Sequence, residues 1–152
     1  MAGGVCPRFG AAIEWDTMAR RLSVVDVDRC VDCLLCAFAC ARRFGEGGLA
    51  RSAIAVRSVG GMERGFVVVV CRACADPPCL AACPMGAIGK VEVGVRVDLE
   101  RCIGCGMCVA ACPIGAVFWD EERGKPVICR HCGLCAGFCP HGVLAFAEVG
   151  GG

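Results

Sequence analysis

CIGCGMCVAACP, residues 102–113, places four cysteines two, two and three residues apart and follows the last cysteine with proline. The same cysteine spacing occurs in CVDCLLCAFACA (residues 30–41) and in CRHCGLCAGFCP (residues 129–140). A fourth copy, CRACADPPCLAACP (residues 71–84), has four residues in its middle gap instead of two. Sixteen of the 17 cysteines thus fall into four quartets, and only Cys6 stands outside them. The chain therefore contains an internal repeat of four units, and we expect the cysteine quartets to determine its fold.

The cysteine content limits the class of protein. Seventeen cysteines in 152 residues indicate either a disulfide framework or metal binding. Disulfides require an oxidising compartment, and residues 1–20 lack the basic and apolar regions of a secretory signal. No apolar run approaches the roughly 18 residues that a membrane helix needs. We therefore expect a cytoplasmic metal-binding protein without a membrane span, and the formal net charge of +1 gives no sign of nucleic-acid binding.

The spacing within each quartet predicts the kind of metal group. The run C-x2-C-x2-C-x3-C-P is typical of bacterial ferredoxins, in which three cysteines hold one [4Fe-4S] cluster and the fourth holds the neighbouring cluster. The competing interpretation is zinc, but zinc ribbons use two separate C-x2-C pairs and not unbroken quartets ending in Cys-Pro. We therefore predict four [4Fe-4S] clusters with cysteine ligands only.

The pairing of the quartets follows from their separation. Cys83 and Cys102 are 18 residues apart, which suits the connection of a two-cluster ferredoxin, so quartets two and three are expected to pair with each other. Quartets one and four must then pair around them. The predicted ligand sets are Cys30, Cys33, Cys36 and Cys139 (site one); Cys71, Cys74, Cys79 and Cys112 (site two); Cys102, Cys105, Cys108 and Cys83 (site three); and Cys129, Cys132, Cys135 and Cys40 (site four). Sequential pairing, one with two and three with four, is the alternative.

The fold class that follows is α+β. Each quartet is expected to form a loop and a short helix between short strands, and the repeat builds two bacterial-ferredoxin-like units with pseudo-twofold symmetry. The second unit, residues 66–112, is nested within the first, which is split into residues 22–65 and 113–149, and residues 1–21 form an arm. Strands are predicted at residues 22–28, 53–59, 66–70, 87–88, 93–98, 117–119, 126–128 and 143–146, and a helix at 107–111.

The second quartet also carries a family resemblance. Its pattern C-x2-C-x2-P-P-C-x3-C-P resembles the four-cluster, ferredoxin-like electron-transfer subunits of molybdenum and tungsten oxidoreductases and of some hydrogenases. The iron–sulfur subunit of dimethyl sulfoxide reductase and formate dehydrogenase β subunits are of this type. The resemblance covers about residues 22–147 and implies the nested pairing. The short chain and the segments CARRFG, VRSVGG, VVVCRAC and WDEE are most similar to the small polyferredoxin partner of tungsten-dependent aldehyde oxidoreductases.

The predicted function is electron transfer without catalysis. All sixteen ligands are cysteines, and the sequence offers neither a nucleophile–base pair nor a nucleotide-binding glycine loop. The resemblance implies a catalytic partner subunit, of the tungsten or molybdenum–pterin aldehyde oxidoreductase type, and further partners that include a flavin or NAD subunit or more copies of the chain. The alternatives are a free polyferredoxin shuttle, a subunit of a hydrogenase or formate dehydrogenase, and a redox-sensing or structural metal-binding module.

Several other side chains have two interpretations. Arg72 and Arg130 lie inside quartets, where they either tune a reduction potential or point into solvent. A basic group of arginines either meets an acidic partner or is simply solvated; it comprises Arg42, Arg43, Arg51 and Arg57. His131 is expected to face solvent, Cys6 to be a free thiol, and Trp15 and Trp119 to pack against neighbours.

Overall fold

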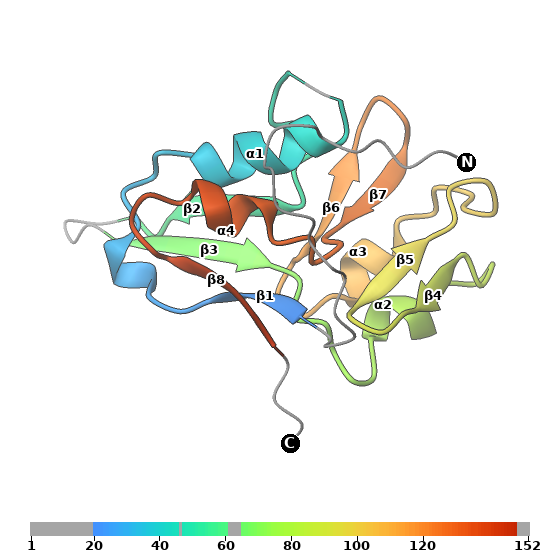
Figure 1. Ribbon diagram of the computed structural model, residues 1–152. Coiled ribbons are helices and arrows are strands. Elements are labelled where there is room, and N and C mark those ends of the chain that lie inside the picture. The colour runs from blue at the N-terminus through green and yellow to red at the C-terminus, as the bar shows by residue number, and fades with distance from the viewer. Residues whose placement is uncertain (1–19, 46, 61–64, 149–152) are drawn as a thin grey trace.

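The computed structural model describes residues 20–45, 47–60 and 65–148, which form a small α+β fold of short strands and short helices (Figure 1). The strands are β1 (Arg20–Val24), β2 (Ile54–Ser58), β3 (Phe66–Val70), β4 (Ile88–Lys90), β5 (Val95–Val97), β6 (Val117–Asp120), β7 (Lys125–Ile128) and β8 (Leu144–Glu148). The helices are α1 (Leu35–Arg43), α2 (Pro78–Ala81), α3 (Met107–Ala111) and α4 (Leu134–Phe138), with a 3-10 turn at Val27–Arg29. No helix within these ranges is long and apolar enough to cross a membrane.

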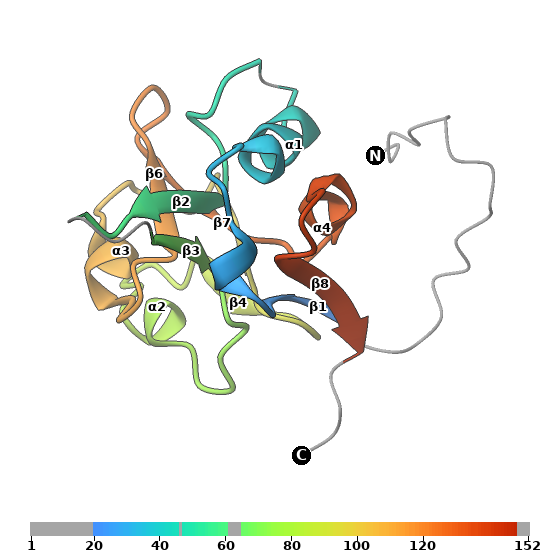
Figure 2. The ribbon, with the colours of Figure 1, turned by 90° about the vertical axis from the view of Figure 1, so that its left-hand side faces the viewer.

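The strands pair two by two, and every pair is antiparallel. β1 pairs with β8, which brings the two ends of the described chain together (Figures 1 and 2). The other pairs, β2–β3, β4–β5 and β6–β7, join strands that are consecutive along the sequence. Each predicted strand occurs, but the first ends at Val24 and not at residue 28, because Asp26 and Asp28 are poor strand residues and the chain turns there.

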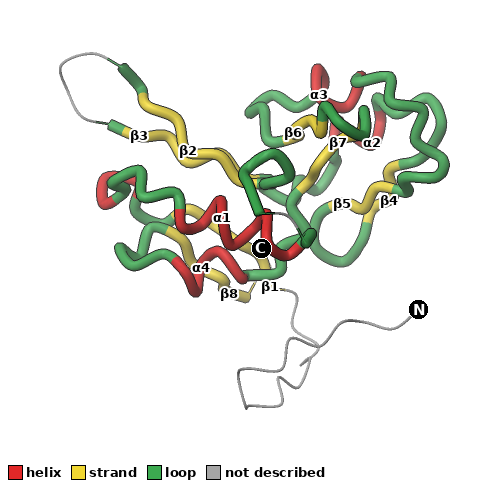
Figure 3. The backbone as a smooth tube through the Cα atoms, turned by 90° about the horizontal axis from the view of Figure 1, so that it is seen from above, coloured by secondary structure: helices red, strands yellow, loops and turns green. Residues whose placement is uncertain are grey.

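The elements lie in two groups, which Figure 3 shows side by side. α1 and α4 lie together beside the β1–β8 pair, whereas α2 and α3 lie together beside β4 to β7. Helices from quartets one and four are therefore neighbours, and so are helices from quartets two and three.

Two clusters of buried residues correspond to these two groups. The first contains Leu22, Ile54, Val70, Leu144, Ala37 and Ala53 together with Cys36, Cys40, Cys129 and Cys135. The second contains Ile88, Val95, Val117 and Ile128 together with Cys79 and Cys108. In the described part of the chain no large side chain is completely buried, so cysteines and small aliphatic residues supply most of both cores.

The hairpin β6–β7 packs with the second group, because Val117 and Ile128 belong to the second cluster. The boundary predicted after Cys112 assigns this hairpin to the split unit instead. A buried ion pair ties the hairpin back to the first group: Nε of Arg51, in the segment between α1 and β2, lies 2.7 Å from Oδ2 of Asp120. The same guanidinium reaches Glu122 at 2.9 Å, so Arg51 joins the two groups and is not part of a solvated basic face.

Candidate metal centres

Every quartet begins with the same turn. In the first C-x2-C segment of each quartet, the residue just before the second cysteine has a left-handed backbone: φ is 57° at Asp32, 53° at Ala73, 72° at Gly104 and 51° at His131. A second left-handed residue, at Leu34, Gly106 or Gly133, starts the helix in three of the quartets. These turns fold the chain back on itself, so that the first three cysteines of a quartet gather around one space.

In the second quartet the helix does not begin after a left-handed residue, because the four residues between Cys74 and Cys79 lead into it differently. Pro77 is the N-cap of α2 in an extended conformation, and Pro78 occupies the first helical position. Proline is favoured at that position because its fixed φ suits a helix and its missing N–H would be unpaired there. The quartet therefore still ends in a helix that carries Cys79.

The fourth cysteine of three quartets accepts a hydrogen bond from a backbone N–H four residues later. The distances are 3.3 Å from Ala87 N to Cys83 Sγ, 3.3 Å from Ala116 N to Cys112 Sγ and 3.4 Å from Val143 N to Cys139 Sγ. The turn is permitted by a left-handed glycine two residues after each proline, at Gly86, Gly115 and Gly142. Backbone N–H groups favour the thiolate form, which is the form that binds metal.

The fourth cysteine of quartet one, Cys40, also accepts a backbone hydrogen bond, but from a residue farther along the chain. Ala41 stands where the other quartets have proline, so α1 continues to Arg43 and no turn follows Cys40. The backbone N–H of Ala53, 13 residues later, donates to Cys40 Sγ at 3.3 Å instead. No sequence signal had identified Ala53 as a donor.

Four hollows in the structure each bring together four cysteines. One is lined by Cys30, Cys33, Cys36 and Cys139; one by Cys71, Cys74, Cys79 and Cys112; one by Cys83, Cys102, Cys105 and Cys108; and one by Cys40, Cys129, Cys132 and Cys135. Each hollow therefore combines three cysteines of one quartet with the last cysteine of another. These sets coincide with the cysteines proposed for sites one to four.

The hollows differ in size in the way the quartets differ in sequence. The hollows of sites one, three and four contain about 340, 340 and 350 Å³ of empty space, and that of site two, with the longer rim, contains about 610 Å³; all four are partly open to solvent. Across the described ranges no three Cys, His, Asp or Glu side chains are grouped so that they hold a single metal ion. Thiols spaced around a hollow fit a group larger than one ion, and their donor chemistry fits a cluster of iron and sulfide.

Burial dominates the acid–base properties of the inner cysteines. It raises the pKa of Cys36 to about 11 and that of Cys129 to about 12, and repulsion from Cys40 and Cys71 contributes to the second rise. Burial also acts on Cys83 and Cys139, but there several backbone N–H groups outweigh it and lower the pKa. Near neutral pH these inner thiols therefore stay protonated unless a metal group supplies positive charge beside them.

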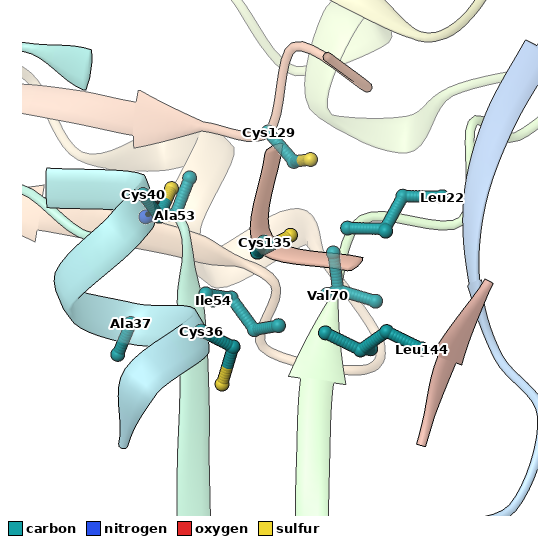
Figure 4. Packing of buried hydrophobic residues seen from close by; sticks show 10 residues of the cluster. All are labelled: Leu22, Cys36, Ala37, Cys40, Ala53, Ile54, Val70, Cys129, Cys135 and Leu144. Atoms are coloured by element: carbon teal, nitrogen blue, oxygen red, sulfur yellow. Dashed lines mark hydrogen bonds between the residues drawn. The ribbon is translucent and has the colours of Figure 1, made fainter. Parts of the chain in front are cut away.

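The site-four cysteines sit inside the first core cluster, and Figure 4 shows Cys40, Cys129 and Cys135 there with Ala53 and Leu22. His131 lies at the same place, so the prediction that it faces solvent is wrong: only 5% of it is exposed. Its Nδ1 accepts the N–H of Leu22 at 3.2 Å, and its own backbone N–H lies 3.3 Å from Cys129 Sγ. Burial, then the charges of Arg21 and Arg96, lower the pKa of His131, so the ring is neutral.

Two of the remaining predictions concern residues outside the described ranges, namely Cys6 and Trp15. Trp119 is half-buried, while Arg42, Arg43 and Arg57 are exposed. Residues that the sequence interpretation missed are Arg96 and Phe44. Neither belongs to a quartet, and both reach site four only through the fold.

The fold and the four thiol-lined hollows define an iron–sulfur protein of the ferredoxin type. Residues 70–116 and 101–143 match the family described as 4Fe-4S dicluster domain. The two matches overlap and together cover residues 70–143, slightly less than half of the chain, and they support a 4Fe-4S ferredoxin-like arrangement there. They also confirm the prediction that it transfers electrons and is not itself the catalytic component.

Two further similarities were found. Over 75 residues the chain is 37% identical to the beta subunit of NADH-dependent phenylglyoxylate dehydrogenase from Aromatoleum evansii. This aligned segment covers 47% of this chain and 17% of that protein. The chain thus spans about a sixth of the length of this curated relative. A chain of the solved BamBC active site complex of benzoyl coenzyme A reductase with benzoyl-CoA aligns with a TM-score of 0.46 and 20% identity, over 86% of this chain and 83% of that one.

Proposed function

We propose that the chain carries four [4Fe-4S] clusters and relays single electrons between a catalytic oxidoreductase subunit and another redox carrier. The observation that carries this proposal is the set of four hollows, each lined by three cysteines of one quartet and one of another. The clusters would be held by these sixteen thiols, and each would supply reversible one-electron chemistry when bound. In this proposal the chain forms two nested ferredoxin-like units, and the inner unit also includes the β6–β7 hairpin.

Cysteines of neighbouring sites lie close together, which supports a continuous relay: Cys36 of site one and Cys135 of site four belong to the first core cluster, and Cys71 of site two packs against that cluster. Cys36 of site one is near enough to Cys135 of site four to contribute to the raised pKa of Cys135, after burial and repulsion within site four itself. Cys71 of site two acts in the same way on Cys129 of site four. Sites two and three share helix α3, which carries Cys108 of site three and is followed directly by Cys112 of site two. The order along the relay is therefore one, four, two, three.

The two ends of this order are open to a partner. Cys33 of site one and Cys105 of site three are exposed, as is Cys74 of site two. The two end sites differ from site two in their exposed apolar neighbours, which are Val31 and Leu35 at site one and Ile103 and Met107 at site three. Exposed apolar side chains around a redox centre suit the short-lived or permanent contact of electron-transfer complexes. Electrons would enter at one end and leave at the other.

The partner proposal is a catalytic subunit of the tungsten or molybdenum–pterin aldehyde oxidoreductase type, in the cytoplasm. It is supported by the Pro77–Pro78 form of the second quartet and by the similarity to a segment of a dehydrogenase subunit. The NADH dependence of that dehydrogenase favours an NAD- or flavin-binding subunit as the second carrier. A freely diffusing polyferredoxin is the second candidate, because both ends of the relay are exposed.

Co-purification under anaerobic conditions tests the partner. The tagged chain, expressed in its own host, should elute with a larger chain, and the complex should contain tungsten or molybdenum besides iron. Elution of the fully loaded chain alone at every protein and salt concentration would instead support the diffusing shuttle.

A further inference from the structure

Site four differs from the other three sites in burial. Cys40, Cys129 and Cys135 are buried and Cys132 is half-buried, so no ligand of this site is exposed. Sites one, two and three each have one buried cysteine and one exposed cysteine. Burial by itself disfavours the addition of negative charge, because a low-dielectric surrounding stabilises charge poorly.

Site four also differs in charge. Its hollow is lined by Arg43, which ends α1, and by Arg130, which follows Cys129. Of the residues that the structure describes, no lysine or arginine lines the hollows of sites one and three, and Arg72 alone lines that of site two. Lys125 is near site three, where its ammonium group donates to the backbone oxygen of Cys102, but it does not line the hollow.

Arg96, on β5, completes a group of three cations at site four. It lines the adjoining larger hollow together with Arg130 and Phe44, and it is close enough to Cys129 and Cys132 to interact with their charge. Burial, then repulsion from Arg130 and Arg43, lowers the pKa of Arg96. Three guanidinium groups are thus crowded together, and negative charge at site four would relieve this repulsion.

The arginines are positioned by the fold. The guanidinium of Arg130 lies 5.2 Å from the ring centroid of Phe44, an arrangement that orients the cation over the aromatic face. Throughout the described ranges no carboxylate forms an ion pair with Arg43, Arg96 or Arg130. Their charge is therefore not cancelled by an acidic neighbour. All three arginines are largely exposed, so water screens part of their charge, but the thiols of site four on which they act are buried or half-buried, where charges interact more strongly than in water.

We infer that Arg43, Arg96 and Arg130 make site four the position of highest reduction potential in the relay. The inference rests on the proposed function, since it requires a cluster at site four. One-electron reduction adds one negative charge to the site without moving a proton on these residues, and the three guanidinium groups stabilise that charge. Site four lies between sites one and two in the relay, so it would hold an electron between the two exposed ends.

An EPR-monitored redox titration of the purified, fully loaded protein tests the inference. Arg96→Gln and Arg130→Gln should each lower the potential of one and the same cluster and leave the other three unchanged. We expect about a tenfold fall in its reduced-to-oxidised ratio at fixed ambient potential, which corresponds to about 59 mV for one electron. Arg96→Lys, which keeps the charge, should restore most of the potential. Arg57→Gln is the control because Arg57 is exposed like the other three arginines but lines none of the hollows.

Cys132→Ser should perturb the same cluster and so assign it to site four. Unchanged potentials in the triple variant R43Q/R96Q/R130Q, with full iron content, would overturn the inference. A wild-type protein with fewer than four clusters would instead overturn the proposed function, so the two failures are distinguishable.

Discussion

At the scale of residues, Gly104 is a position where the backbone of a quartet leaves no room for a side chain. Its φ is +72°, and a Cβ added there would lie 2.6 Å from the backbone oxygen of Gly124, in the turn between β6 and β7. Gly106, two residues away, has almost the same φ of +74° but nothing within 4 Å of an added Cβ. Substitutions at these two glycines therefore distinguish the cost of a left-handed backbone, which both share, from the cost of a steric clash, which only Gly104 has.

We therefore expect Gly104→Ala to cost more than Gly106→Ala. Gly106→Ala should lower the free energy of unfolding by about 1 kcal/mol, because alanine is strained in the left-handed region. Gly104→Ala carries the same strain and also forces the β6–β7 turn to move, so its loss should reach about 3 kcal/mol. Urea unfolding of the loaded proteins, followed by visible absorbance, measures both. Equal losses would mean that the approach to Gly124 is unimportant.

At the scale of elements, we propose that the pairing of helices decides which cysteines bind the same cluster. α1 lies beside α4 and α2 beside α3, so the last cysteine of each quartet is brought to the hollow of its partner quartet. Nested pairing places Cys36 and Cys139 in one site, whereas sequential pairing places them in two different sites. The two schemes therefore predict different results for the same double variant.

The variant C36A/C139A tests this pairing. Nested pairing predicts the loss of one cluster, about four irons, and three intact [4Fe-4S] signals by quantitative EPR. The control C36A/C40A removes ligands from two sites under either scheme and should leave two intact clusters. Two intact clusters in C36A/C139A would contradict nested pairing.

Much of this element-scale arrangement could be predicted from the sequence, because cysteine spacing and Cys-Pro ends are local signals. The helix at Met107–Ala111 has the predicted bounds, and the strand at Phe66–Val70 does as well. The N–H of Ala53 on Cys40 and the ion pair of Arg51 with Asp120 had no such signal, since they join residues 13 and 69 positions apart. His131 was misassigned because its burial depends on Leu22 and Gly94, which reach it only in the folded chain.

At the scale of the whole molecule, the two cores consist largely of cysteines and small side chains. Six of the sixteen quartet cysteines belong to these cores, and the described part of the chain contains no completely buried large side chain. So thin a core provides little hydrophobic burial to offset the conformational entropy that folding costs, and a bound metal group supplies additional stability. We therefore expect folding and cluster binding to be coupled.

Removing the metal tests this coupling. Treatment with a chelator and an oxidant, followed by thiol reduction, should abolish most of the far-UV circular dichroism and the cooperative thermal transition. Reconstitution with iron and sulfide should restore both. An apoprotein that keeps its dichroism and melts cooperatively would show that the protein part is stable by itself.

The central claim is that four [4Fe-4S] clusters occupy one chain, and metal analysis of the anaerobically purified protein tests it most directly. Iron and acid-labile sulfide should each reach about 16 per chain, with zinc well below one. About eight of each, or stoichiometric zinc, would contradict the claim.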